Sequence, residues 1–233
     1  MASRFLVDQY QGNPDMNDLR LDDDSPYRVG VVDTGVANLV SIQVAFRRIG
    51  VEVSLVRSAD EVASASGIVL PGVGSFGSGM AAVDRRGLID PIRKRVESGR
   101  PLFAICLGLQ MLCSGSEESP GVPGIGALDT MVRRLPPGSN RPHLGWNRVV
   151  VEGDAESRLV VSTGAAYFAN GFALSEIPAG WSGAWSSDGG RFVAAIEREG
   201  VVACQFHPEL SGSFGREVLS RWMSLVQESS SCC

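Results

Sequence analysis

The chain has 233 residues, of which 26 are acidic and 21 are basic, so its formal charge at pH 7 is −5. A chain without a surplus of positive charge has little to hold a nucleic-acid backbone, which disfavours nucleic acid as a partner. No stretch approaches the roughly 20 uninterrupted apolar residues that span a bilayer, and residues 1–12 lack the basic cluster and apolar core of a signal peptide. We therefore expect one compact cytoplasmic domain without membrane association.

Cysteine and histidine are too sparse and too irregularly spaced to frame a metal site. The only histidines are His143 and His207, and no Cys-x-x-Cys or His-x-x-x-His pair is present. An odd number of cysteines does not form a disulfide framework, and we expect reduced thiols. The sequence predicts neither a metal nor a cofactor. The cysteines are Cys106, Cys113, Cys204, Cys232 and Cys233.

Composition divides the chain into three segments. Residues 1–27 carry aspartates among Asn, Pro and Gln and are too polar to bury a face, which predicts a flexible N-terminal extension. Residues 28–226 hold the apolar runs and form the predicted domain. Residues 227–233 have few apolar side chains, and we expect them to form a flexible tail.

The first half of the domain alternates between strand and helix patterns. An apolar, β-branched run at residues 27–33 enters a turn at Thr34-Gly35, and apolar residues then recur at helical spacing from Leu39 to Ile49. This alternation predicts an α/β fold, a mostly parallel sheet covered by helices on both faces. Further strands are expected at residues 51–56, 67–70 and 101–105, and further helices at 80–98 and 107–112.

The second half has a different texture. After Cys113 the chain is rich in Gly, Pro and Ser, and it then shows short strand patterns at residues 165–169, 192–197 and 201–206. We expect these strands to extend the same sheet in antiparallel fashion. An apolar stripe from Phe214 to Leu225 predicts the last helix.

Cys106 stands where a predicted strand turns into a predicted helix. Such a turn exposes a nucleophile, and a helix N-terminus favours the thiolate form of a cysteine. The same pattern also fits a buried, inert cysteine, so Cys106 alone does not decide between the two. A nearby base would favour the catalytic interpretation.

His207 and Glu209 offer such a base. Residues i and i+2 of an extended segment project to the same side, and Pro208 keeps His207 away from helical angles. A cysteine, a histidine and an acid that orients the histidine form the triad of cysteine hydrolases. The alternative is a loop histidine with a chance acidic neighbour. His143 is the competing base, but it is expected in a Pro-x-x-Gly turn with Gly145 two residues on.

A glycine-rich segment follows the strand at residues 67–70 and contains Gly72, Gly74 and Gly77 in a Gly-x-Gly-x-x-Gly pattern. One interpretation is a dinucleotide fingerprint, which requires an acidic residue at the end of the next strand. That strand ends at Cys106 instead. A second interpretation is an oxyanion hole, with the N–H of Leu107 as a further donor. A plain flexible loop is the third.

The sequence resembles class I, triad-type glutamine amidotransferases, most of all the glutaminase subunits of imidazole glycerol phosphate synthases. Matching segments run from Val31 to about Leu225. The wider class shares the nucleophile box Cys-Leu-Gly-x-Gln at Cys106 and the His-Pro-Glu box at His207. Four further segments narrow the resemblance, namely Asp33–Leu39, Leu70–Gly74, Pro142–Asn147 and Ser211-Gly212.

This resemblance implies that Cys106 attacks the side-chain amide of glutamine, that His207 moves the proton and that Glu209 holds His207. It implies a thioester intermediate and ammonia that travels to a (β/α)8 cyclase subunit in a heterodimer. The oxyanion hole falls at Gly72, Val73, Gly74 and Leu107. Contacts to glutamine fall at Gln110, Asn170, Gly171 and Phe172. The interface with the synthase subunit falls at Asn38, Pro142, His143, Leu144, Trp146 and Asn147.

The chain departs from the family pattern at several positions. The family usually reads Tyr-Phe-x-His-Ser-Tyr where this chain has Tyr167-Phe168-Ala169-Asn170-Gly171-Phe172. A basic residue usually follows the His-Pro-Glu box, and this chain has Leu210 there. Ala104 stands where glycine is usual. Alternatives are therefore a paralogous amidotransferase that amidates a surface-polysaccharide sugar, a dinucleotide-binding domain, and a non-catalytic scaffold.

Overall fold

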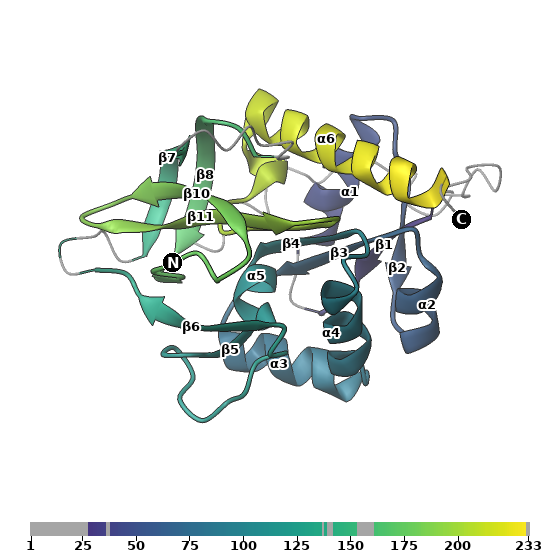
Figure 1. Ribbon diagram of the computed structural model, residues 1–233, viewed down its shortest axis with the longest axis horizontal. Coiled ribbons are helices and arrows are strands. Elements are labelled where there is room, and N and C mark those ends of the chain that lie inside the picture. The colour runs from purple at the N-terminus through teal and green to yellow at the C-terminus, as the bar shows by residue number, and fades with distance from the viewer. Residues whose placement is uncertain (1–27, 36–37, 137, 139–141, 153–160, 232–233) are drawn as a thin grey trace, which may run out of the picture.

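The computed structural model describes residues 28–35, 38–136, 138, 142–152 and 161–231. Within these residues nine strands form one large sheet, in the order β2-β1-β3-β4-β12-β11-β10-β7-β8 (Figure 1). The predicted extension at residues 1–27 lies outside the described residues. The strands are β1 (Val29–Val32), β2 (Val53–Val56), β3 (Gly67–Gly72), β4 (Leu102–Cys106), β7 (His143–Val151), β8 (Gly164–Asn170), β10 (Ser182–Ser187), β11 (Arg191–Arg198) and β12 (Val201–Cys204).

The sheet is parallel in one half and antiparallel in the other. Strands β2, β1, β3, β4 and β12 pair in parallel, and β12, β11, β10, β7 and β8 pair in antiparallel fashion. This confirms the predicted α/β class with antiparallel strands added by the C-terminal half. Strand β12 pairs with both β4 and β11, so the segment before His207 lies beside the segment that ends at Cys106.

Helices cover both faces of the sheet, as predicted (Figure 1). On one face, Phe46 and Trp222 pack with their rings edge to face, 6.2 Å between centroids. They join α1 and α6 to one hydrophobic cluster, and α2 to α5 contribute to the cluster on the other face. The helices are α1 (Leu39–Arg47), α2 (Ala59–Ser64), α3 (Phe76–Arg85), α4 (Ile89–Glu97), α5 (Leu107–Leu112) and α6 (Gly212–Ser231).

A second, small sheet was not predicted. It has the order β5-β6-β9, with β5 parallel to β6 and β9 antiparallel to it. Strand β5 reads Cys-Ser-Gly-Ser and has no apolar alternation to mark it as a strand. The strands are β5 (Cys113–Ser116), β6 (Leu128–Arg134) and β9 (Phe172–Ala173).

Two predictions about local structure were wrong. The single helix expected at residues 80–98 is two helices, α3 and α4, because Gly87 adopts a positive φ of 65° between them. His143 begins strand β7 and does not lie in a turn. Helix α6 continues to Ser231 and so includes the first residues of the segment expected to form a tail.

Candidate active site

Cys106 is the last residue of β4, and α5 begins at the next residue. Its backbone adopts φ 54° and ψ −108°, an uncommon conformation for a residue with a side chain. The four residues before it are buried and fix the end of the strand in the core. The fold therefore holds this thiol at a sharp turn between strand and helix, as the sequence predicts.

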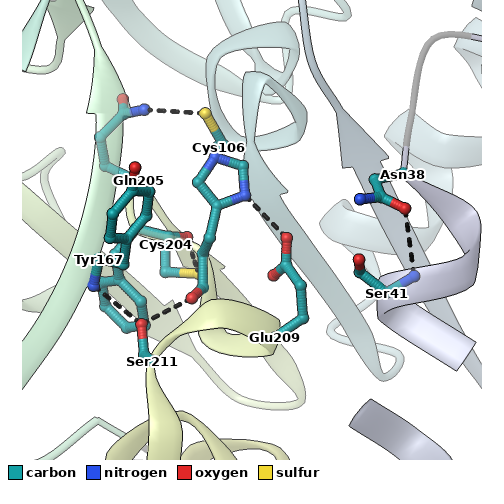
Figure 2. Close-up of polar contacts among 10 residues, drawn as sticks. Asn38, Ser41, Cys106, Tyr167, Cys204, Gln205, Glu209 and Ser211 are labelled. Atoms are coloured by element: carbon teal, nitrogen blue, oxygen red, sulfur yellow. Dashed lines mark hydrogen bonds and ion pairs between the residues drawn. The ribbon is translucent and has the colours of Figure 1, made fainter. Parts of the chain in front are cut away.

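The imidazole of His207 is held by Glu209. His207 Nδ1 lies 2.8 Å from Glu209 Oε1, and both side chains are less than a tenth exposed. His207 has an extended backbone, φ −101° and ψ 98°, which matches the effect expected of Pro208. Because the carboxylate bonds Nδ1, the other ring nitrogen is left to face a reacting group. Figure 2 marks the bond to Glu209 with a dashed line.

A set of hydrogen bonds fixes the backbone of His207. Its N–H donates to the carbonyl of Tyr167 at 2.9 Å, and the hydroxyl of Ser211 donates to its carbonyl at 2.6 Å. The N–H of Tyr167 in turn donates to Ser211 Oγ at 2.9 Å (Figure 2). Strand β8 and the 3-10 turn η1 (Pro208–Leu210) thus clamp the base in place.

The charge state of His207 depends on its neighbours. Burial of the ring lowers its pKa, but the negative charge and hydrogen bond of Cys106 outweigh this, together with the hydrogen bond and charge of Glu209. The net effect raises the pKa of His207 to about 11. Contacts with the sulfur of Cys106 and the carboxylate of Glu209 favour the imidazolium form of His207.

A pocket opens beside this pair and brings together most of the predicted site residues. Glu209 and Gly72 lie outside its lining, whereas Glu118 and Ala169 line it without having been predicted. Glu118 belongs to a polar loop with no distinguishing pattern, so the sequence offered no signal for it. The lining consists of Val73, Gly74, Cys106, Leu107, Gln110, Glu118, Ala169, Asn170, Gly171, Phe172 and His207.

The glycine turn after β3 packs closely against the start of α5. A Cβ at Gly72 would lie 2.8 Å from Leu107 Cβ, and Gly74 has a positive φ of 94° with open space around it. The turn therefore presents its backbone to the same pocket that holds Cys106. Backbone of this kind is suited to donate N–H groups to an oxyanion.

The dinucleotide hypothesis fails on the contacts of this same turn. It places a phosphate at the N-terminus of the helix after the glycines. In α3 the N–H of Phe76 donates to Glu118 Oε2 at 2.7 Å, and the N–H of Gly77 donates to Ser119 Oγ at 3.1 Å. A carboxylate and a hydroxyl thus occupy the donors that a pyrophosphate needs.

Amide side chains order the far wall of the pocket. Gln110 Nε2 donates to the carbonyl of Phe172 at 3.0 Å, and Asn170 Nδ2 donates to the same carbonyl at 3.1 Å. Asn170 Oδ1 is buried without a hydrogen-bond partner in the described protein. Gln205, which contacts Gln110 and Cys106, was not among the site residues predicted from the sequence. Its polar side chain in the apolar run that leads to His207 is a signal that could have identified it.

The residues predicted to contact a synthase subunit divide into exposed and buried ones. Leu144 and Trp146 on β7 are 62% and 58% exposed, which is unusual for large apolar side chains. His143 on the same strand is buried, and its Nδ1 lies 2.8 Å from Asp188. Asn147 is half-buried, whereas Pro142 is exposed. Asn38, also exposed, caps α1 by accepting a hydrogen bond from the N–H of Ser41 at 3.2 Å.

The other described cysteines, Cys113 and Cys204, are free and buried. Burial raises the pKa of Cys113 to about 12. Burial, followed by the charges of Glu209 and Cys106, raises the pKa of Cys204 well above its ordinary value. Neither thiol is a nucleophile at neutral pH. In the described ranges no helix is long and apolar enough to cross a membrane, and no group of three His, Cys, Asp or Glu residues could hold a metal ion.

Known proteins are similar to this chain over most of its length. The model of the class I glutamine amidotransferase family matches residues 30–224, and the chain belongs to that family. Its relatives include HisH subunits of imidazole glycerol phosphate synthase from Symbiobacterium thermophilum and Methanothermobacter thermautotrophicus. Each is 37% identical over 85% of this chain, covering 94% and 99% of the relative.

Two further relatives extend the comparison. The chloroplastic imidazole glycerol phosphate synthase hisHF of Arabidopsis thaliana is 34% identical over 95% of this chain, which matches 39% of that longer protein. A crystal structure of a glutamine amidotransferase superposes with a TM-score of 0.68 at 23% identity, over 85% of this chain and 98% of the other. This structural likeness confirms the fold.

Proposed function

We propose that this chain is the glutaminase subunit of an imidazole glycerol phosphate synthase. It hydrolyses glutamine to glutamate and ammonia in the cytoplasm and passes the ammonia to a cyclase subunit of histidine biosynthesis. The observation that carries the proposal is the placement of Cys106 and His207 in one pocket, with Glu209 bonded 2.8 Å from the far ring nitrogen. Relatives that match nearly their whole length are HisH subunits.

The first half of the reaction starts from a thiolate at Cys106 and an imidazolium at His207. The thiolate of Cys106 attacks the carbonyl carbon of the glutamine side-chain amide, and the oxygen becomes an oxyanion. The backbone at Val73, Gly74 and Leu107 lines the pocket where this charge develops. As the carbon–nitrogen bond breaks, the imidazolium of His207 donates its proton to the leaving nitrogen, which departs as ammonia.

The second half regenerates the thiol. The product of the first half is a thioester between Cys106 and the glutamyl group, and His207 is now neutral. Water adds to the thioester carbon while His207 accepts its proton, and the carbon–sulfur bond then breaks. Glutamate leaves, and the proton returns to the Cys106–His207 pair. Glu209 keeps the ring oriented through both halves by its bond to Nδ1.

The exposed apolar side chains near the pocket support docking of the partner. Val73 and Leu210 are 40% and 45% exposed, and both adjoin site residues in sequence. Trp146 lies with its ring 6.3 Å from that of Tyr167, which precedes the pocket residues of β8. We propose that Leu144, Trp146 and the loop ends around the pocket bind a (β/α)8 cyclase subunit in a heterodimer. The docked partner would then receive ammonia before it reaches solvent.

The test is to purify this chain with and without the cyclase subunit of the same genome and to measure glutamate release. We expect slow release alone and strong stimulation by the partner with its ligand, since docking aligns the oxyanion donors. Cys106→Ser should abolish release in both states. Normal release by that variant would refute the assignment of the nucleophile.

A second measurement separates catalysis from a scaffold. A glutamine-like alkylating agent should label Cys106 in the complex, and glutamine should protect it. A chain that forms the heterodimer but is neither labelled nor active is a scaffold, and the proposal would then be wrong.

A further inference from the structure

Gln205 links two residues of the pocket lining, Cys106 and Gln110, from the short segment that joins β12 to His207. Its side chain is fully buried, and its Nε2 donates a hydrogen bond to Cys106 Sγ at 3.5 Å (Figure 2). Its Oε1 accepts a hydrogen bond from Gln110 Nε2 at 3.0 Å. A buried amide needs such partners, and none of the steps above uses this residue.

The direction of these hydrogen bonds is fixed by a backbone carbonyl. The oxygen of Phe172 can only accept, so the atom of Gln110 that lies 3.0 Å from it is the amide nitrogen. The same nitrogen faces Gln205, which must present its oxygen there. Gln205 therefore turns its own N–H group toward the sulfur of Cys106. The hydrogen bonds that run from the Phe172 carbonyl through Gln110 to Gln205 therefore assign the orientation of both side-chain amides.

We propose that Gln205 is a positioning residue that stabilises the thiolate of Cys106 and holds Sγ beside His207. An N–H donor interacts more strongly with a thiolate than with a neutral thiol, because a charged acceptor strengthens the hydrogen bond. The proton that leaves Sγ moves to the ring nitrogen of His207 that Glu209 does not bond. The second bond of Gln205 couples the place of the sulfur to that of Gln110, which lines the pocket.

Other titratable groups around the sulfur have different roles. His207 is the counter-ion, and Glu209 on η1 lies behind its ring. Cys204 on β12 is a buried thiol that stays protonated. Glu118 lines the pocket but accepts from the N-terminus of α3. Gln205 thus supplies a neutral donor, because its side-chain amide does not titrate.

The test measures alkylation of Cys106 by iodoacetamide between pH 6 and pH 10. Because the chain has five cysteines, the modified peptide is identified by mass spectrometry. Gln205→Met keeps the length of the side chain but removes both hydrogen bonds. Gln205→Glu keeps the acceptor toward Gln110 and replaces the donor toward Cys106 by an oxygen.

We expect Gln205→Met to react about tenfold more slowly than the unchanged chain at pH 7, as for the loss of one hydrogen bond to a charged group. The two rates should converge toward pH 10, because the alkaline solvent removes thiol protons with or without the amide. Gln205→Glu should be slower still at pH 7, because an ionised carboxylate repels the thiolate.

A glutaminase assay of the complex gives a second readout, which rests on the proposed function. There kcat should fall about tenfold with KM for glutamine within about twofold, because the buried amide of Gln205 does not line the pocket. The alkylation result stands even if the chain has no glutaminase activity, so failure of the two proposals is distinguishable.

Val202→Ala is the matched control, since Val202 is a fully buried residue of β12 away from the pocket lining. It should lower the melting temperature without slowing alkylation. The proposal is overturned if Gln205→Met alkylates at the unchanged rate at pH 7, or if it is slowed by one constant factor at every pH. The pH dependence is read within one variant, so a partial loss of stability does not obscure it.

Discussion

The backbone of Gly108 lies directly against the carbonyl of Leu70: a Cβ on Gly108 would sit 2.0 Å from that oxygen. This contact joins α5, which begins one residue after the nucleophile, to β3, which leads into the glycine turn. It sets the separation between Cys106 and the backbone at Gly72–Gly74. The active site thus depends on an interatomic distance that only glycine permits.

Gly108→Ala tests this distance. The backbone carbonyl cannot move aside, so α5 must shift away from β3 and carry Cys106 with it. We expect glutaminase activity to fall by about a hundredfold, as a displacement near 1 Å does in an active site. Gly115→Ala is the control, because the nearest atoms there belong to the flexible end of Met131, at 3.3 Å. Equal activity of the two variants would contradict the argument.

Glu209→Gln should lower kcat for glutamine hydrolysis about a hundredfold or more and leave KM nearly unchanged. The amide still reaches His207 Nδ1 but does not stabilise the imidazolium, and it favours the wrong tautomer. Steady-state kinetics of the complex measure this. A rise in KM with kcat unchanged would show that Glu209 binds substrate rather than the base.

The same substitution should also reduce the dependence of the free energy of unfolding on pH. The pKa of His207 in the folded protein is about 11, above its ordinary value of 6.5. The native state therefore binds the extra proton, and this stabilisation is complete below pH 6.5 and is lost as the pH rises through 11. Urea unfolding should show the unchanged chain about 2 kcal/mol more stable than Glu209→Gln at pH 6.5. The gap should narrow as the pH approaches 11 and close only above it; a constant gap would contradict the pKa.

Trp146→Ala should weaken the heterodimer about thirtyfold, which is the usual effect of losing a central aromatic anchor. Stimulation of glutaminase by the partner should need correspondingly more partner, whereas iodoacetamide should label Cys106 in the isolated variant at the normal rate. Arg221→Ala is the control, because this exposed side chain lies on α6 and pairs with Glu217 at the surface. Comparable weakening by both would place the interface elsewhere.

Arg95→Met should lower the free energy of unfolding by about 3 kcal/mol without changing kcat. The buried guanidinium donates hydrogen bonds to the carbonyls of Pro101, Val62, Ala65 and Ser66, which join α4 to the start of β3 and β4. Removing it takes the donor from the carbonyls of Val62 and Ser66, whereas Pro101 keeps the N–H of Ile68 and Ala65 keeps Arg100 Nη2. Chemical denaturation measures the loss, and a change confined to kcat would contradict a purely structural role.

The placement of Cys106 at a turn and of Glu209 against His207 was predictable because both depend on local rules. A strand that turns into a helix presents Cys106, and the i, i+2 spacing in an extended segment presents Glu209 to His207. The pocket wall at Asn170 and Phe172 followed only from the family resemblance. No local pattern places β8 opposite α5.

The interactions that cross the fold were not predictable. Glu118 reaches the N-terminus of α3 across 42 residues of chain, and Gln205 reaches Cys106 across 99.

The capping box of Ser58 and Glu61 did mark α2, by both of its reciprocal hydrogen bonds, and could have been recognised.

The central position of β12 has a consequence for biosynthesis of the chain. Until residues 201–204 leave the ribosome, β4 has an unpaired edge, and its terminal cysteine has no imidazole beside it. A prematurely terminated polypeptide therefore carries the attacking atom and most of the hydrophobic interior, yet cannot turn over substrate. We therefore expect ammonia production to begin only after residues 201–209 have been added.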